Sequence, residues 1–362
     1  MNSTFTAFAF ALALPVVSDG MQDYLRQNGK SPAHYLLTKL SDHRIVLVGE
    51  HHWQRSDAQL IGGVVSELRR RNVALAMEVV RASSQVDIDT LISAKEWNQA
   101  LANEIMRAAD WPYVQYRDIL YQAWEANRVA GAPPLKIIAL GPPEDWRKQG
   151  IRYEAFMAER VRNYATDNQH RVIVYCGLHH AFTRYLQVER LQRGRATEFM
   201  DRMGNILWRQ FGQDVFLIAL HKPEGCGEGE DAFAKSCAPL GGAIDCAAVR
   251  NGGTPVGFDI LSSPIAETKL DAKSFYAAAH PLLRMVDIVD GYIWQQPVDD
   301  ATMVELIPLE EYSPTEVRLP DSQAAWQKRA HDLAHPKKRP SWGSLGEWRT
   351  KCGLPVPAAA AR

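Results

Sequence analysis

The chain has 362 residues, of which 46% are hydrophobic, so it is long enough to bury a sizeable core in one large domain or two. Its 41 Lys and Arg residues are balanced by 42 Asp and Glu residues, and this absence of a strong field of one sign argues against electrostatic binding of nucleic acid or an anionic membrane. After the N-terminus no run reaches the roughly 18 apolar residues of a membrane span, so we expect no integral membrane segment.

The first 20 residues contain a short apolar run, Phe5 to Val17, that fits two interpretations. Ala11-Leu12-Ala13 imitates a signal-peptidase site, which would make the run a cleaved signal peptide. No Lys or Arg precedes the run, however, and the balance lies slightly with a cytoplasmic protein. We divide the chain into a signal or disordered lead over 1–20, one domain over 21–310 and a Pro-rich C-terminal extension over 311–362.

From residue 21 onward, apolar strands alternate with helices. We expect a helix over 21–43, a strand over Ile45–Val48, a helix from about Ser56, which is a good N-cap residue, and a strand over Val73–Met77. Two or three helices then cover about 84–130. Further along, the sequence predicts strands over 136–140, 172–175 and 215–220, with helices over about 151–167 and 180–193 between them. This alternation predicts an α/β fold with a mainly parallel central sheet flanked by helices.

The pattern changes after residue 221. Residues 222–254 are rich in Gly and Cys with little periodicity, so we expect an irregular insertion, followed by two short β-like pieces over 255–260 and 291–294. Within the insertion, Cys226, Cys237 and Cys246 match no zinc pattern; they allow one disulfide if the protein is exported. A helix is predicted over 322–334, and disorder over 355–362.

Ionisable residues gather where three of the predicted strands end. The first strand leads into Glu-His-His at residues 50–52, the second into Glu78, and the fourth into Gly-Leu-His-His at 177–180. The carboxyl ends of parallel strands meet at one rim of an open α/β sheet, which is where such sheets place their ligands. A group of imidazoles and carboxylates at this rim predicts an acid/base site, a metal site or both.

Each of these residues has a structural interpretation beside the functional one. Because strand residues alternate faces, Glu50 and His52 should share a side, where the carboxylate would fix the ring's tautomer; the alternative is a polar turn. Glu78 ends a buried run, so it needs a partner, either at the rim or in Arg81. His180 would lie in the first turn of a helix, whose dipole lowers the imidazole pKa and favours a neutral base or metal ligand.

The order of these motifs resembles that of the ChaN-like and Tiki superfamily over about residues 40–220. The matching motifs are Gly-Glu-x-His at 49–52, Met77-Glu78, the Trp-Pro sequence with Tyr116 at 111–116, and Gly-x-x-His at 177–180. That superfamily includes haem-binding uptake proteins, erythromycin-esterase-like hydrolases and TraB/Tiki-type metalloproteases. The resemblance implies that the catalytic residues, or the ligands of a metal if one is bound, are Glu50, His52, Glu78 and His180.

Four further residues are expected to contact a substrate. Tyr116 and Arg117 lie on the helix that borders the pocket in the resemblance, and Trp53 and His179 adjoin the motifs. In a hydrolase, His52 or a bound zinc or manganese ion would activate water to cleave an ester or amide of a small molecule or peptide.

Two other functions stay open. An aromatic-rimmed pocket could hold haem non-covalently through an axial His or Tyr, or the fold could serve as an interaction module without catalysis. The sequence has no Gly-x-Gly-x-x-Gly after a strand and no P-loop, so no nucleotide cofactor is expected.

Overall fold

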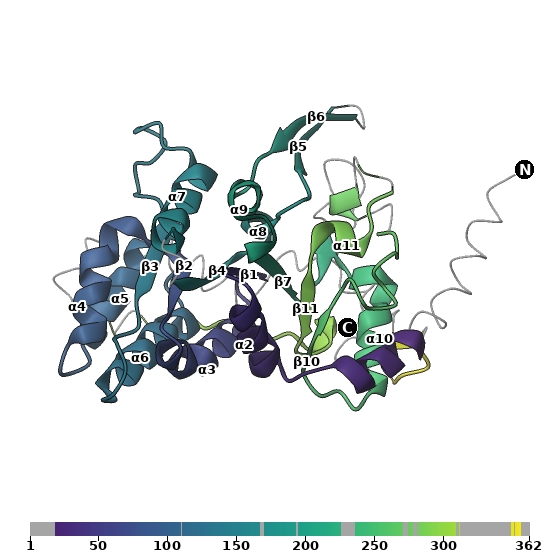
Figure 1. Cartoon of the computed structure of the whole chain (residues 1–362), viewed down its shortest axis with the longest axis horizontal. Coiled ribbons are helices and arrows are strands. Elements are labelled where there is room, and N and C mark those ends of the chain that lie inside the picture. Colours follow the sequence, from purple (N-terminus) through teal and green to yellow (C-terminus); the bar gives the residue numbers. More distant parts are fainter. Residues whose placement is uncertain are drawn as a thin grey trace, which may run out of the picture.

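The computed structural model describes residues 19–109, 111–166, 170–192, 195–225, 236–270, 274–277, 280, 282–308, 311, 349–350 and 352–355. Within them a seven-stranded sheet crosses the molecule in the order β10-β11-β7-β1-β4-β2-β3 (Figure 1). Its neighbouring strands are parallel, except that β10 pairs antiparallel with β11. The predicted α/β fold with a mainly parallel sheet flanked by helices is therefore confirmed.

The centre of the sheet consists of the strands predicted from their apolar runs. They are β1 (Ile45–Glu50), β4 (Arg171–Gly177), β7 (Val215–Leu220) and β2 (Val73–Arg81). Every residue of β1 is buried, as expected of a β-branched run covered on both faces. In the register, Glu50 is opposite Gly177 of β4 and Gly49 is opposite Ala219 of β7. The carboxyl ends of these strands therefore lie level with one another.

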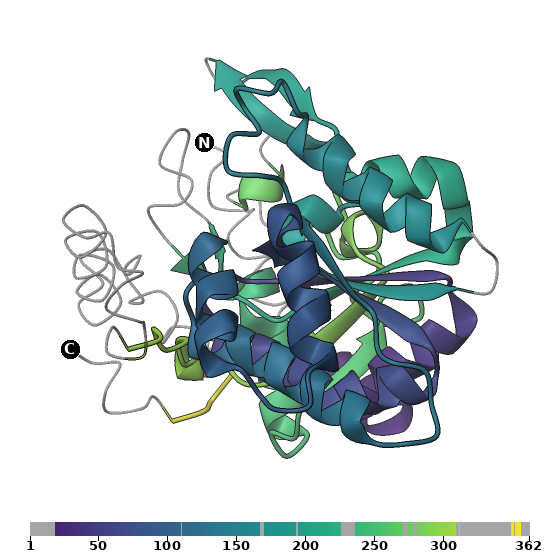
Figure 2. The ribbon, with the colours of Figure 1, turned by 90° about the vertical axis from the view of Figure 1, so that its left-hand side faces the viewer.

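Helices cover both faces of the sheet and form a separate hydrophobic core on each (Figure 2). One face carries α2 (Pro32–Asp42), α3 (Arg55–Arg70), α4 (Gln85–Ser93), α5 (Gln99–Ala108) and α6 (Val114–Arg128). The other carries a helix over 19–28, α7 (Tyr153–Ala165), α9 (Met203–Phe211) and α10 (Ala243–Arg250).

Shorter elements complete the described part. The edge strands of the sheet are β3 (Ile137–Gly141) and β10 (Val256–Asp259), and β11 (Gly291–Trp294) lies between β10 and β7. Outside the sheet, β8 (Glu224–Gly225) pairs with β9 (Ser236–Cys237). The short helices are η1 (Ala82–Ser84), α8 (Leu178–Ala181), η2 (Gly212–Asp214), η4 (Pro239–Gly242), η5 (Phe275–Ala277), α11 (Met285–Ile288) and η6 (Val298–Asp300). Within the described part, no helix is long and apolar enough to cross a membrane.

Two predicted boundaries near the N-terminal half were wrong. The helix predicted over 21–43 is broken: Gly29 follows the first helix and Pro32 begins α2. A Cβ at Gly29 would lie 2.5 Å from the carbonyl oxygen of Leu25, so the backbone passes there only without a side chain. The second strand continues to Arg81, which puts Glu78 inside β2 instead of after it, although the ladder to β4 stops at Met77.

The helix predicted over 180–193 was also wrong. After the four residues of α8 the chain forms a hairpin of β5 (Gln187–Gln192) and β6 (Arg195–Met200), which projects from the sheet (Figure 1). Aromatic and β-branched residues such as Val188 and Phe199 favour strands over helices, and pairing the two arms satisfies their backbone groups locally.

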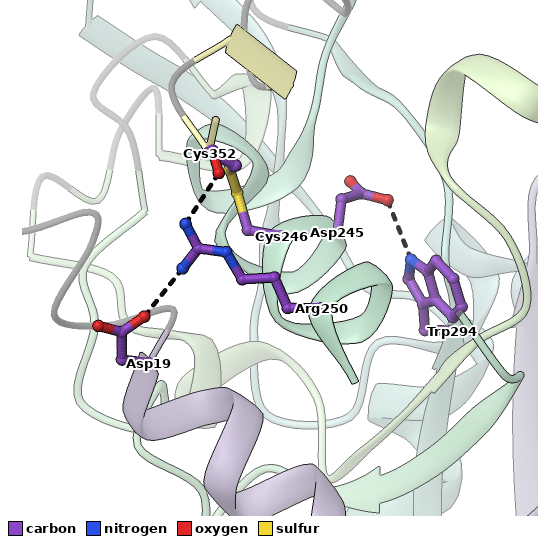
Figure 3. The surroundings of a disulfide bond; sticks show 6 residues. All are labelled: Asp19, Asp245, Cys246, Arg250, Trp294 and Cys352. Carbon is purple, nitrogen blue, oxygen red and sulfur yellow. Dashed lines mark hydrogen bonds and ion pairs between the residues drawn. A yellow bond between two sulfur atoms is a disulfide. The ribbon is translucent and has the colours of Figure 1, made fainter. Parts of the chain in front are cut away.

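The insertion over 222–254 is more ordered than expected, because it contains α10. Cys246, on this helix, forms a disulfide with Cys352, 106 residues away (Figure 3). A disulfide within the Cys cluster, which the sequence allows, therefore does not involve Cys246; Cys237 is disulfide-bonded as well. The helix predicted over 322–334, and most of the predicted N-terminal lead and C-terminal tail, lie outside the described residues.

Candidate functional site

Four of the predicted site residues meet at the carboxyl edge of the sheet. His52 Nδ1 lies 2.8 Å from Glu50 Oε1, and His180 Nε2 lies 3.0 Å from Glu78 Oε1. His52 Nε2 lies 3.8 Å from Glu78 Oε2, so the four side chains form one row across β1, β2 and the end of β4. We call Glu50, His52, Glu78 and His180 the rim cluster.

Glu50 is fixed by two tyrosines. The Tyr116 hydroxyl lies 3.1 Å from each carboxylate oxygen, and the Tyr175 hydroxyl donates to Oε2. Burial, reinforced by the charge of Glu50, raises the pKa of both phenols well above the usual range, so they stay neutral donors. With Glu50 as acceptor, neutral His52 carries its proton on Nδ1 and leaves Nε2 as the basic nitrogen.

The His52 side chain is partly exposed to solvent, and neighbouring charges change its pKa. Its side chain is 21% exposed, and its ring centre lies 4.4 Å from that of Trp111. Burial opposes the charged ring, but the Glu78 charge and the Glu50 hydrogen bond outweigh it and raise the pKa of His52 above the usual value. A Cβ at Gly177 would lie 2.6 Å from His52 Nε2, so the imidazole can occupy its position only because residue 177 has no side chain.

Glu78 and His180 form a buried ion pair with further partners. The Gly177 N–H donates to Glu78 Oε2 at 2.7 Å, and His180 Nδ1 lies 2.8 Å from Glu154 Oε1 on α7. Glu154 is in turn bonded to Arg202 Nη1 at 2.8 Å. The pair is therefore one section of a chain of alternating charges that runs from Glu78 on β2 through α8 and α7 to Arg202, the N-cap residue of α9.

The charge of His180 is the opposite of the one expected from a helix dipole. Burial disfavours the imidazolium, but Glu78 and Glu154 more than compensate and raise the pKa of His180 to about 10. Burial likewise opposes the ionised form of Glu78, yet the two imidazoles lower the pKa of this carboxyl far below its usual range. Because α8 is only four residues long and two carboxylates hold the ring, His180 is a cation at neutral pH.

The other histidine of each pair, His51 or His179, lies within electrostatic range of Lys222, which follows β7. His179 Nε2 lies 3.2 Å from the Tyr276 hydroxyl. Burial and the charge of Lys222 lower the pKa of His179 to about 2 and that of His51 to about 3, so both rings are neutral. The backbone N–H of His51 donates to the buried Asp57 at 3.2 Å.

Of the other two predicted substrate contacts, one lies beside the rim cluster and one does not. Trp53 is 39% exposed beside the rim cluster and has a positive φ of 77°, a strained conformation for a bulky residue. Arg117, by contrast, donates to Asn103 and pairs with Glu311 near the C-terminal extension, so the structure does not join it to the rim cluster.

Some members of the site were missed in the sequence. Trp111 was identified as part of a motif, but the contact of its ring with that of His52 was not predicted. Tyr175 lies in the strand predicted over 172–175, and its place in an apolar run does not indicate that its hydroxyl reaches Glu50. No pattern in the sequence indicated that Glu154 belongs to the site, since it lies on a separate helix, 26 residues before His180.

The side chains of the rim cluster do not fit a metal ion. Among the described residues, no group of three or more His, Cys, Asp or Glu is arranged to hold one. Both nitrogens of His180 are bonded to carboxylates, and His52 Nδ1 is bonded to Glu50. What remains is His52 Nε2 with one Glu78 oxygen, short of the three protein ligands typical of catalytic zinc. For haem, the same nitrogen is the axial donor available in this cluster, because Tyr116 and Tyr175 are buried against Glu50.

Comparison with known proteins gives a family match over part of the chain and a likeness in fold. Residues 36–152 match the family described as haem-binding uptake, Tiki superfamily, ChaN, and no curated protein matches the chain. A solved succinoglycan biosynthesis protein is 8% identical, with a TM-score of 0.54 over 81% of this chain and 99% of its own. Its likeness shows the fold alone.

Two other solved structures are more distant. An erythromycin esterase in an open conformation is 9% identical, with a TM-score of 0.49 over 76% of this chain and 94% of its own. A structure of cofacial haem binding to ChaN of Campylobacter jejuni is 14% identical, with a TM-score of 0.32 over 55% of this chain and 87% of its own. The family match over 36–152 confirms the resemblance predicted from the motifs: this part of the chain is similar to the ChaN and Tiki superfamily.

Proposed function

We propose that the chain is a hydrolase that cleaves an ester or amide bond with His52 as a metal-free general base. The observation that supports this is the 3.8 Å separation of His52 Nε2 and Glu78 Oε2. It is too long for a direct hydrogen bond, yet one water molecule can contact both atoms. At the same time Glu50 holds the opposite nitrogen of the ring at 2.8 Å. This is the arrangement of a base oriented by a carboxylate.

In the proposed reaction, the water oxygen attacks the substrate carbonyl carbon while its proton passes to His52 Nε2. Glu50 stabilises the imidazolium that forms, since Nδ1–H continues to donate to it. The bond from the carbonyl carbon to the leaving oxygen or nitrogen then breaks, and the proton moves from His52 to the leaving group. The products are a carboxylic acid and an alcohol or amine.

The remaining members of the cluster shape the electrostatics of this step. Glu78 accepts from the backbone of Gly177 and orients the water. The imidazolium of His180, 3.0 Å from Glu78, offsets a negative charge that would otherwise repel the developing oxyanion. Trp53 and Trp111, with ring centres 6.1 Å apart, supply an apolar wall beside the base.

The test is a screen of aryl esters, aliphatic esters and amides with wild type, His52→Gln and Glu50→Gln. Removing the base should lower kcat/KM by about 10²–10⁴-fold. Since a base acts only when deprotonated and the pKa of His52 is raised, the acid limb of the pH profile should lie above the usual histidine value. Glu50→Gln should move this limb to lower pH and reduce the plateau.

Controls separate the possible outcomes. His34, on the surface of α2, is a matched residue whose change to Gln should leave turnover unaltered. Turnover lost in a chelator and restored by zinc or manganese would contradict the metal-free mechanism. Activity that survives His52→Gln would remove His52 from the reaction.

The family description makes non-covalent haem binding the second candidate function. It is favoured by the exposed Trp53 beside the accessible Nε2 of His52. Titration with haemin should then give a Soret band that His52→Gln shifts or abolishes, with no ester turnover in either protein.

A further inference from the structure

A lysine lies at the carboxyl end of β7, beside the rim cluster. β7 is the parallel neighbour of β1, so Lys222, two residues beyond its end, comes to the same edge of the sheet as Glu50 and His52. Besides burial, its charge lowers the pKa of His51, which places the ammonium within electrostatic range of that ring. Lys222 is partly buried, so its charge is less hydrated than that of a surface lysine.

Tyr276 holds this ammonium in place. Lys222 Nζ donates to the Tyr276 hydroxyl at 3.0 Å and lies 5.6 Å from the ring centre. The same hydroxyl lies 3.2 Å from His179 Nε2, so it links the lysine to the motif at the end of β4. Tyr276 is itself fixed, because the Tyr185 hydroxyl donates to its backbone oxygen at 2.9 Å and Phe182 packs edge-on against its ring.

The positive charge of Lys222 has no ion-pair partner among the described carboxylates. Asp57 is in electrostatic range, but its carboxyl accepts from Gln54, from Gln295 and from the backbone of His51. Burial, with the charge of Glu50, raises the pKa of Asp57 well above its usual range and favours the neutral acid. Asp57 therefore neutralises little of the positive charge of Lys222.

A cavity opens at the lysine. Its volume is about 30 Å³, enough for a group the size of a carboxylate, and beyond this the cavity opens to solvent. Its polar lining comes from Lys222, Glu224, Tyr276 and Tyr292, and Glu224 accepts from Ser274 Oγ at 3.3 Å. The rest is apolar and includes Leu178, Leu220, Met285 and Ile288. A ligand suited to this space carries one anionic group for the ammonium and a short aliphatic part for the walls.

We propose that Lys222 and Tyr276 bind the carboxylate of the substrate, so that the ester or amide cleaved belongs to an anionic, aliphatic acyl or peptide-type molecule. The ammonium and the phenol hydroxyl supply charge-assisted donors at a preorganised position, and the apolar walls exclude a larger polyanion. The assignment of a substrate rests on the proposed hydrolase function, whereas the carboxylate site itself rests on the surroundings of Lys222.

Calorimetric titration with hexanoate tests the site without any turnover. Wild type should bind hexanoate and bind neutral hexanamide at least tenfold more weakly. Lys222→Met, which keeps the aliphatic stem but removes the charge, should weaken the binding of hexanoate about tenfold or more. Tyr276→Phe should weaken it by less. The matched control is Lys136→Met, which removes a charge that pairs with Asp89 at the opposite end of the sheet; it should bind as wild type does.

The outcomes distinguish the two proposals. Equal binding of hexanoate to wild type and Lys222→Met, or of hexanoate and hexanamide to wild type, would overturn the carboxylate site even if esters are hydrolysed. Charge-dependent hexanoate binding without hydrolysis of any ester or amide would instead refute the catalytic proposal and leave the binding site standing. Inorganic phosphate that binds more tightly than hexanoate would contradict the assignment of a carboxylate. Circular dichroism and Tm establish that each variant is folded.

Discussion

At the scale of single residues, the site depends on groups that leave space for the His52 ring or fix the position of its proton. Gly177 has an ordinary φ of −56°, so its backbone does not require glycine. Its importance comes from the neighbouring ring, because any Cβ would stand 2.6 Å from His52 Nε2. A residue of this kind affects the chemistry more than the stability of the fold.

Gly177→Ala should therefore lower kcat/KM while the protein remains folded. The added methyl displaces the imidazole by a few tenths of an ångström or more, and misplacement on the order of 1 Å costs about 10²-fold in rate. The comparison variant is Gly63→Ala on α3, where an added Cβ meets nothing within 4 Å; it should keep full activity and gain stability. Equal kinetics for wild type and Gly177→Ala would show that the ring does not need its present position.

At the scale of elements, the sequence predicted the strands much better than the connections between them. The apolar runs of β1 and β7 define these strands, and β1 brings Glu50 to the rim. They could be predicted because the apolar pattern of a buried central strand is visible in its own short stretch of sequence. The β5–β6 hairpin was missed because a short amphipathic stretch fits either a helix or a strand, and tertiary pairing decides between them.

The same limit applies to the charge of His180. Glu78 could be placed from its strand, but Glu154 reaches the ring from α7 through packing that no local pattern encodes. Without Glu154 the helix dipole was the strongest effect visible in the sequence, and it gave the wrong direction for the pKa. The positions of the rim cluster were therefore predictable, and its protonation states were not.

The contacts of α7 and α8 predict a pH-dependent stability. Because the pKa of His180 is raised from 6.5 to about 10, its favourable contribution is complete below about pH 6.5 and is lost as the pH rises through 10. Urea unfolding at pH 6.5 and pH 10 should show wild type losing stability, on the order of 3 kcal/mol, relative to His180→Gln. A constant difference between the two proteins across this range would mean that His180 is not charged in the folded state.

At the scale of the whole molecule, one helix connects segments that are distant in the sequence. On α10, Asp245 accepts from Trp294 Nε1 at 2.9 Å (Figure 3) and from His221 Nε2, also at 2.9 Å. Arg250 of the same helix bonds Asp19 of the first helix and the carbonyl oxygen of Cys352. The helix thus joins the N-terminal helix, the C-terminal segment and the ends of β7 and β11, and the disulfide makes one of these links covalent.

The Cys246–Cys352 bond should contribute to stability far more than to catalysis. It closes a loop with a sequence separation of 106, and the double variant Cys246→Ser/Cys352→Ser should lose about 2–5 kcal/mol because its unfolded chain is less restricted. Thermal unfolding of both proteins without reductant measures this, with kcat expected to stay within a factor of two because the bond lies away from the rim cluster. A non-reduced peptide map should contain residues 246 and 352 in one linked fragment.

Disulfides of this kind persist in oxidising compartments, so a linked fragment from protein made in its natural host would favour export over the slight preference for the cytoplasm. Fully reduced cysteines in that protein, together with an unchanged Tm in the double variant, would contradict both expectations.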